Sequence, residues 1–220
     1  MRPRASLAVA GLLLVVSFGC AAVSAPPSAP DPAIARCPPE LAVKVRFLEQ
    51  RLEGEARYAR RWWTVWNGVH GAGIVVSGSL AGIEDGRGER AGHVVDAAKA
   101  GIGLAQNLLT PPLAKDALRQ LRSFDLAAPG GCQRRITEAE GLLVRAAEQA
   151  RHERRSWWPH LSNLALNLVG AWIVAESFDE GSGWSSGALG LVVGELQIWT
   201  YPARSERILE EYRRRYPQEP

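Results

Sequence analysis

The sequence predicts an all-α protein formed by tandem duplication, and two observations support this. The run Arg60-Arg61-Trp62-Trp63 returns once, as Arg154-Arg155-Ser156-Trp157-Trp158, and a shift of 95 residues also brings Cys37 onto Cys132. Apolar residues recur every three or four positions, which is the period of an amphipathic helix. A repeat of this length indicates one structural unit used twice.

Each half is expected to contain an amphipathic helix, an apolar helical hairpin and a short charged helix. The expected halves are residues 40–130 and 131–216. Duplicated halves often pack about a pseudo-two-fold axis, as the subunits of a symmetric dimer do. We expect that arrangement here.

Residues 1–20 have the pattern of an export signal. Arg2 and Arg4 precede an apolar stretch, which ends in Ser17-Phe18-Gly19-Cys20. This ending resembles the lipobox of bacterial lipoproteins, with Ser17 where a branched aliphatic residue is usual. The resemblance implies a lipid on Cys20 and a place in the bacterial cell envelope. Cleavage after Val23-Ser24-Ala25 and an uncleaved anchor helix are the alternatives, and in each case the chain from Cys37 onward is exported.

Residues 21–39 are expected to form a tether, because prolines are frequent and apolar periodicity is absent. Extended proline-rich chain rises about 3 Å per residue, so the body would lie a few nanometres from the anchor.

The mature chain would keep two cysteines, Cys37 and Cys132, at equivalent positions of the two halves. Equivalent residues near a pseudo-two-fold axis meet, so a disulfide between them is predicted. Two unpaired thiols are the alternative, since spacing alone does not fix the geometry.

Each half begins with an expected amphipathic helix. Apolar residues of the first fall on one stripe, and Thr137 with Glu140 has the form of a capping box before the second. The first stripe consists of Leu41, Val45, Leu48, Leu52, Ala56 and Ala59.

Four apolar segments follow as two hairpins, at residues 64–83, 91–109, 159–177 and 184–200. Each would extend about 27 Å as a helix, which approaches the thickness of a bilayer core. Tryptophans gather at the segment ends, like the aromatic belt of a membrane protein.

Polar and small residues form narrow stripes on these segments, with Asp96, Lys99 and Glu195 as the charged candidates for a functional role. The stripes consist of Asn67, His70, Gly71, Ser77 and Gly78 on the first segment, His93, Asp96, Lys99, Gly103 and Gln106 on the second, and Asn163, Asn167 and Gly170 on the third. In lipid such a stripe faces other helices, and in water it faces solvent. Membrane-inserted hairpins and an extracytoplasmic helical bundle are both compatible with the pattern. Asp96 and Lys99 oppose insertion, as does the placement of the arginine-rich segment ends outside the membrane.

No motif for catalysis, cofactor binding or phosphate binding is present, so we expect a protein without enzymatic activity, cofactor or metal. Convergence of His70, His93 and His160 with Glu195 is the one metal or enzyme hypothesis that the residues allow. The acidic twin loops 84–88 and 179–183 are more simply turns than cation sites. A net charge of +3 does not favour nucleic acid.

The expected function is therefore that of a membrane-anchored envelope protein that scaffolds or binds protein partners. Its contacts with the lipid bilayer would be made through Cys20 and, if the hairpins insert, through the apolar hairpins. The alternative is a small transport or pore subunit whose polar stripes line a path.

Overall fold

A computed structural model describes residues 32–178 and 180–217, and these ranges contain helices and no strand. The all-α prediction is confirmed. The tandem duplication and the pseudo-two-fold packing remain predictions. The elements in chain order are η1 (Pro32–Arg36), α2 (Pro39–Ile83), α3 (Arg87–Leu109), α4 (Ala114–Arg122), α5 (Gly131–Arg155), α6 (Trp157–Ser177), α7 (Glu180–Trp199) and α8 (Arg204–Arg215).

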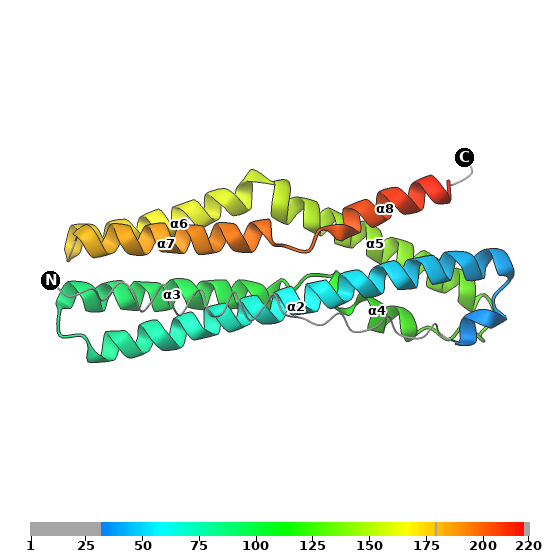
Figure 1. Cartoon of the computed structure of the whole chain (residues 1–220), viewed down its shortest axis with the longest axis horizontal. Helices are drawn as coiled ribbons and strands as arrows, with labels where there is room; N and C mark the ends of the chain where they lie inside the picture. The colour runs from blue at the N-terminus through cyan, green and yellow to red at the C-terminus, as the bar shows by residue number, and fades with distance from the viewer. Residues whose placement is uncertain (1–31, 179, 218–220) are drawn as a thin grey trace.

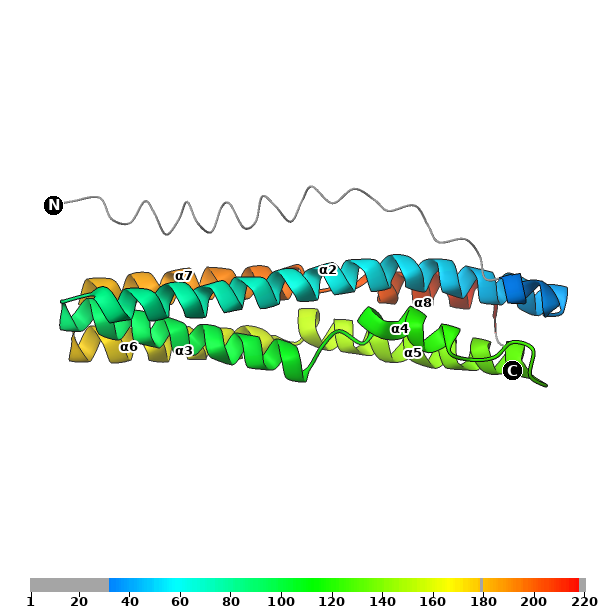
Figure 2. The same ribbon diagram turned by 90° about the horizontal axis from the view of Figure 1, so that it is seen from below.

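The molecule is a rod of two helical bundles joined end to end (Figures 1 and 2). Helix α2, with 45 residues, runs through both. Its first part, to Trp62, packs with α4, α5 and α8 in what we call the charged bundle. Its second part, residues 63–83, pairs with α3, and this hairpin lies against the hairpin of α6 and α7. We call these four segments the coated bundle, and the junction between the bundles the waist.

The two halves of the sequence differ in how they cross the waist. The sequence predicts a separate amphipathic helix and apolar helix in each half, but α2 is continuous whereas α5 ends at Arg155. The residue that explains the difference is Pro159, which occupies the place of Thr64 in the first half. Proline has no N–H for the carbonyl of residue 155 and collides with it, so the helix stops. A new helix, α6, starts with the Ser156 hydroxyl accepting a hydrogen bond from the Trp158 N–H at 3.2 Å.

The predicted capping box is wrong. Helix α5 begins at Gly131, so Thr137 and Glu140 lie in its second and third turns. Gly130, in the left-handed region with φ of 68°, makes the turn into the helix. Gly131 permits close approach, since a Cβ there would lie 2.3 Å from the carbonyl oxygen of Asp125. Backbone geometry, which the spacing of Thr137 and Glu140 does not reveal, therefore sets where α5 starts.

The charged bundle has an ordinary apolar core. The stripe predicted on the first helix faces it: Val45, Leu48, Leu52, Ala56 and Ala59 are buried, and Leu41 is half-buried against the same core. Residues from η1, α4, α5 and α8 complete the core. At its far end Cys37 and Cys132 lie at disulfide distance, with sulfur atoms 2.05 Å and Cα atoms 5.8 Å apart. The predicted cysteine pair is confirmed.

One ion pair is buried in the charged bundle. Arg135 donates to Glu49 Oε1 at 2.7 Å and to the carbonyl oxygen of Phe124 at 2.8 Å. The side chains of Arg135 and Glu49 are 3% and 7% exposed. Two charges so far from water are tolerated because each offsets the other.

The coated bundle has the opposite distribution of side chains. Of the large apolar residues that are exposed in the described ranges, all except Val43, Leu113 and Phe178 belong to this bundle, and Phe178 directly follows α6. We call this outer layer the apolar coat. It includes Val75, Val76, Ile102, Leu168, Val169, Trp172, Ile173, Val192, Leu196 and Trp199. Taken one at a time, none of the helices in the described ranges has the length and mean apolarity that crossing a membrane requires.

Candidate functional site

The interior of the coated bundle is polar. Fully buried large apolar side chains are scarce there, Val174 being the main one, whereas Asn107 and Asn167 are each 5% exposed. From the predicted stripes, Asp96, Lys99, Asn163 and Asn167 face the interior between the hairpins, whereas Gly78 and Gln106 are exposed. This is the arrangement expected for helices whose surroundings are apolar.

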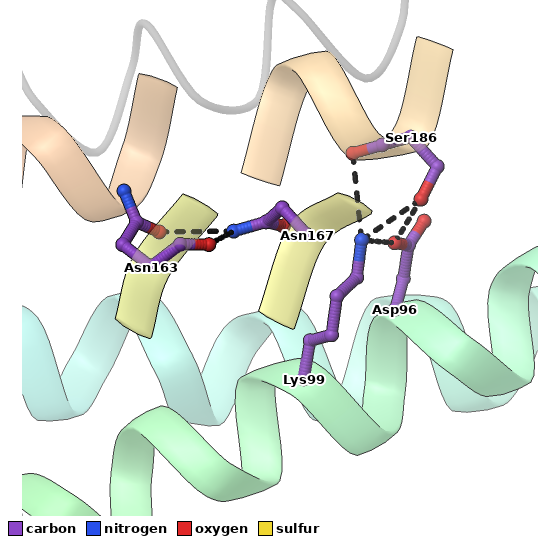
Figure 3. A network of polar contacts seen from close by, with 5 residues as sticks. All are labelled: Asp96, Lys99, Asn163, Asn167 and Ser186. Atoms are coloured by element: carbon purple, nitrogen blue, oxygen red, sulfur yellow. Dashed lines mark hydrogen bonds and ion pairs between the residues drawn. The ribbon is translucent and has the colours of Figure 1, made fainter. Parts of the chain in front are cut away.

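Asp96 and Lys99 meet in this interior. Lys99 Nζ lies 2.8 Å from Asp96 Oδ1 and 3.0 Å from Ser186 Oγ, and the Ser186 hydroxyl donates to Asp96 Oδ1 at 2.5 Å. Figure 3 shows that this group joins α3 to α7. The Lys99 side chain is 11% exposed and the Asp96 side chain 33%. The pair therefore links two hairpins and is not a surface salt bridge.

A second polar group runs along α6 and α7. Asn167 Nδ2 donates to Oδ1 of Asn163 at 2.9 Å (Figure 3), and Asn163 Nδ2 donates to Glu195 Oε1 at 3.1 Å. Glu195 Oε2 lies 2.8 Å from His160 Nδ1 and accepts from Trp199 Nε1 at 3.2 Å. Glu195, the third predicted stripe residue, is thus held by three neighbours.

A third group joins the two hairpins nearer the waist. His70 Nε2 and Gln197 Oε1 are 2.9 Å apart, and Gln197 Nε2 donates to Asn107 Oδ1 at 2.9 Å. These side chains come from α2, α7 and α3, so each hairpin contributes. Gly103 makes room for the imidazole, because a Cβ at that position would lie 2.4 Å from His70 Cε1.

Members of all three groups line a cavity of about 580 Å³, whereas His160, Glu195 and Trp199 of the second group lie outside its lining. It begins at the waist, where Trp62, Trp158 and Tyr201 line it, and reaches Asp96 and Lys99. Three polar atoms of lining side chains have no hydrogen-bond partner: Asn107 Nδ2, Asn167 Oδ1 and the Tyr201 hydroxyl. A buried polar group without a partner costs about 1–3 kcal/mol, so a ligand hydroxyl or a water that reached one of these atoms would offset that cost.

Glycines bring α6 and α7 close enough to make this interior. A Cβ at Gly190 would lie 1.9 Å from Asn167 Oδ1, and one at Gly194 would lie 2.0 Å from Asn163 Oδ1. Any larger residue would displace the asparagine amides. The Gly-xxx-Gly spacing of α7 therefore serves helix contact, as in membrane helix pairs.

The tryptophans of the first repeated motif, together with Trp66, hold the waist together. Trp62 Nε1 and Trp66 Nε1 donate to the Thr200 hydroxyl at 3.1 and 3.2 Å, and Trp63 Nε1 donates to the carbonyl oxygen of Asn107 at 2.9 Å. Trp157 and Trp158 of the second motif are instead 68% and 55% exposed. The same sequence motif thus has different surroundings in the two halves.

Ionisable groups at the waist are affected by burial. Burial raises the pKa of Glu55 and of Glu153 above the ordinary glutamate value. Burial, together with the charges of Glu153 and Glu55, also raises the pKa of the Tyr201 phenol. Tyr201 is therefore a neutral hydroxyl at any physiological pH.

The predicted convergence of histidines does not occur. His160 meets Glu195, His70 meets Gln197, and His93 joins neither group. No cluster of three or more metal-binding side chains is found within residues 32–178 and 180–217. Residue 179 of the second acidic loop lies outside the described residues. Residues 1–31, which include Cys20, also lie outside them.

Sequence reasoning missed Asn107, Ser186 and Gln197. Helical spacing was the available signal, since Asn107 lies four residues after Gly103 on the stripe of α3. On α7, Ser186, Gly190, Gly194 and Gln197 form a stripe of small and polar residues at helical spacing. Glycine and serine are less conspicuous than a charge, which is why Glu195 alone was selected on this helix.

Comparison with known proteins gives no relative: no family model, curated protein or solved structure matches the chain.

Proposed function

We propose that this protein is a membrane-anchored helical protein of the bacterial cell envelope, in which the coated bundle contacts lipid and the charged bundle scaffolds or binds a protein partner. The observation that carries the proposal is the reversal of polarity along one rod. Apolar side chains line the core of the charged bundle but cover the outside of the coated bundle. An apolar coat of this extent is unfavourable in water and favourable against hydrocarbon.

The dimensions of the coat fit a bilayer. The coated part of α2, residues 63–83, extends about 30 Å as a helix, close to the thickness of the hydrocarbon core. Trp157, Trp158 and Trp199 are exposed at the waist, and Trp184 is exposed near the opposite end. Tryptophan favours the boundary between hydrocarbon and water, which supports lipid as the material that covers the coat.

The charged bundle supplies the scaffolding part of the proposal. Its disulfide-bonded pair favours an exported location, because such bonds persist in oxidising compartments. A lipid on Cys20 and the proline-rich tether would keep it at the membrane surface. Its exposed faces carry charges of both signs, such as Arg51 with Glu211 and Arg119 with Asp116, and these favour a polar protein partner.

Alkaline carbonate extraction of membranes tests the lipid contact. The chain with Cys20→Ser has no acylation site, so its retention in the membrane pellet reports on the coat. Val76→Glu adds a carboxylate to the coat, where Val76 is 55% exposed. We expect it to move the Cys20→Ser chain to the supernatant, because a charge in hydrocarbon costs about 3 kcal/mol.

Val43→Glu is the matched control, since Val43 is 43% exposed on the charged bundle. It should leave the distribution of the Cys20→Ser chain unchanged. Release of the Cys20→Ser chain without any further substitution would overturn the lipid contact. A discrete oligomer in that released fraction would show that a second copy covers the coat instead.

A second candidate function is a small transport or pore subunit, and the polar cavity favours it. Liposomes that contain the protein would then pass a small polar solute faster than empty liposomes. Equal rates would eliminate this candidate and leave the scaffold.

A further inference from the structure

We propose that the cavity of the coated bundle is a binding site for an uncharged polyhydroxylated molecule about the size of a monosaccharide. A volume of about 580 Å³ lies within the range of small-molecule sites. The inference goes beyond a scaffolding role. It does not depend on whether lipid or protein covers the coat, because the cavity is formed by the interior faces of the helices.

The charges of the cavity favour a neutral ligand. Deep in the cavity the charged side chains are Asp96 and Lys99, which pair with each other at 2.8 Å. His152 and Glu153 lie at the waist end. An ion that entered the deep part would lose its hydration without a free counter-charge, which is strongly unfavourable.

The hydrogen-bonding groups favour hydroxyls. Asn107 offers an unpartnered donor, Asn167 an unpartnered acceptor, and Tyr201 a hydroxyl that can do either. Each of these residues is more than nine-tenths buried, with 5%, 5% and 7% exposure. A hydroxyl group both donates and accepts, so several hydroxyls on one frame can satisfy amides and a phenol together.

Aromatic rings at the waist end add an apolar surface. Trp62, Trp158 and Tyr201 line the cavity there, and the rings of Trp62 and Tyr201 pack edge to face at 5.0 Å. A cyclic polyol has C–H groups that pack against an aromatic face while its hydroxyls point elsewhere. This combination of rings and amides suits a cyclic polyol better than a linear apolar molecule.

Saturation-transfer NMR on the full chain tests the proposal. The protein is purified in a zwitterionic detergent, because a detergent with a sugar head group would compete for the site. The probes are myo-inositol and glucose, and glucosamine and glucuronate are the charged counterparts. We expect transfer to the two neutral probes and much weaker transfer to the charged ones. Absence of transfer to both neutral probes, or equal transfer to all four, would overturn the proposal.

Variants locate the binding. Asn107→Leu and Asn167→Leu should each weaken binding about tenfold, because each removes one hydrogen bond to the ligand. Asn67→Leu is the matched control: the Asn67 amide is also without partners, but it does not line the cavity. An equal loss in Asn67→Leu would contradict the site.

A smaller change covers the case in which the leucine variants do not fold. Tyr201→Phe removes an unpartnered hydroxyl and leaves the ring, and it should weaken binding several-fold without lowering the melting temperature. Tyr216→Phe removes another unpartnered hydroxyl, in the segment after α8 and away from the cavity. Unchanged affinity in Tyr201→Phe, or the same loss in both variants, would refute the assignment of the cavity.

Discussion

The charged bundle and the coated bundle are built on the same helix, yet they bury opposite kinds of side chain. In its first part α2 buries Leu48 and Leu52, and in its second part it exposes Val75 and Val76. The core of the charged bundle is held by apolar burial, which needs no particular partner for each group. The interior of the coated bundle is held by hydrogen bonds that link named pairs. The core of the charged bundle should therefore tolerate replacement of one apolar side chain by another. The interior of the coated bundle should be sensitive to the loss of a single polar group.

The largest expected effect of a single substitution is in the charged bundle, at its buried ion pair. Arg135→Met should lower the free energy of unfolding by about 3–5 kcal/mol, because it removes the buried guanidinium that binds Glu49 Oε1 at 2.7 Å. Chemical denaturation followed by far-ultraviolet circular dichroism measures this. Arg119→Met is the control, since Arg119 is 77% exposed and its pair with Asp116 is worth less than about 1 kcal/mol. A similar decrease in the free energy of unfolding in the two variants would mean that water reaches Arg135 and Glu49 inside this bundle.

The sequence predicts the charged bundle better than the coated one. Apolar spacing identified the stripe from Val45 to Ala59, and the repeat identified Cys37 with Cys132. In each case a local pattern determines what the residue contacts. The unbroken α2 was not predicted. Residue 64 is threonine, so α2 continues past it, whereas proline at the equivalent position 159 ends α5.

The interior of the coated bundle was predicted only as far as its stripes. Spacing placed Asp96 and Lys99 on one face of a helix, but a stripe alone does not tell whether that face meets solvent or other helices. The partners of the stripe come from other helices: Ser186 lies 87 residues from Lys99, and Gln197 lies 127 residues from His70. Such pairings depend on the packing of the hairpins, which local periodicity does not encode.

A second prediction compares two equivalent ion pairs in the two bundles. Asp96→Ala should lower stability by about 1–3 kcal/mol, because Lys99 stays inside with only Ser186 to bond. Asp116→Ala removes an aspartate with the same i, i+3 spacing from the surface of the charged bundle, where the effect should be under about 1 kcal/mol.

Tryptophan fluorescence measures the Asp96 effect, since all eight tryptophans lie at residue 62 or beyond, in the coated bundle and at the waist. Far-ultraviolet circular dichroism, which follows the helices of both bundles, measures the Asp116 effect. The double variant Asp96→Ala with Lys99→Met should recover part of the loss, because it removes the unpaired charge. Equal effects of Asp96→Ala and Asp116→Ala would mean that the polar interior is open to water, and the contrast between the bundles would fail.

The smallest expected effect concerns Glu55, a buried carboxyl of the charged bundle near the waist. Its Oε1 accepts from the Ser205 hydroxyl at 3.1 Å, while Oε2 has no hydrogen-bond partner, and burial raises its pKa. Because the pKa is higher in the folded than in the unfolded protein, protonation of Glu55 favours folding. This contribution is complete below the ordinary glutamate pKa of about 4.3, and it is lost as the pH rises through the folded value.

Glu55→Gln stays neutral throughout, so it should stabilise the protein at neutral pH by about 1 kcal/mol, roughly the value of one hydrogen bond. The gain over the parent should shrink as the pH falls toward 4. Denaturation of both chains between about pH 4 and pH 8 measures the difference. A difference that is constant across this range would show that Glu55 titrates normally, and that its carboxylate reaches water despite a residue exposure of 1%.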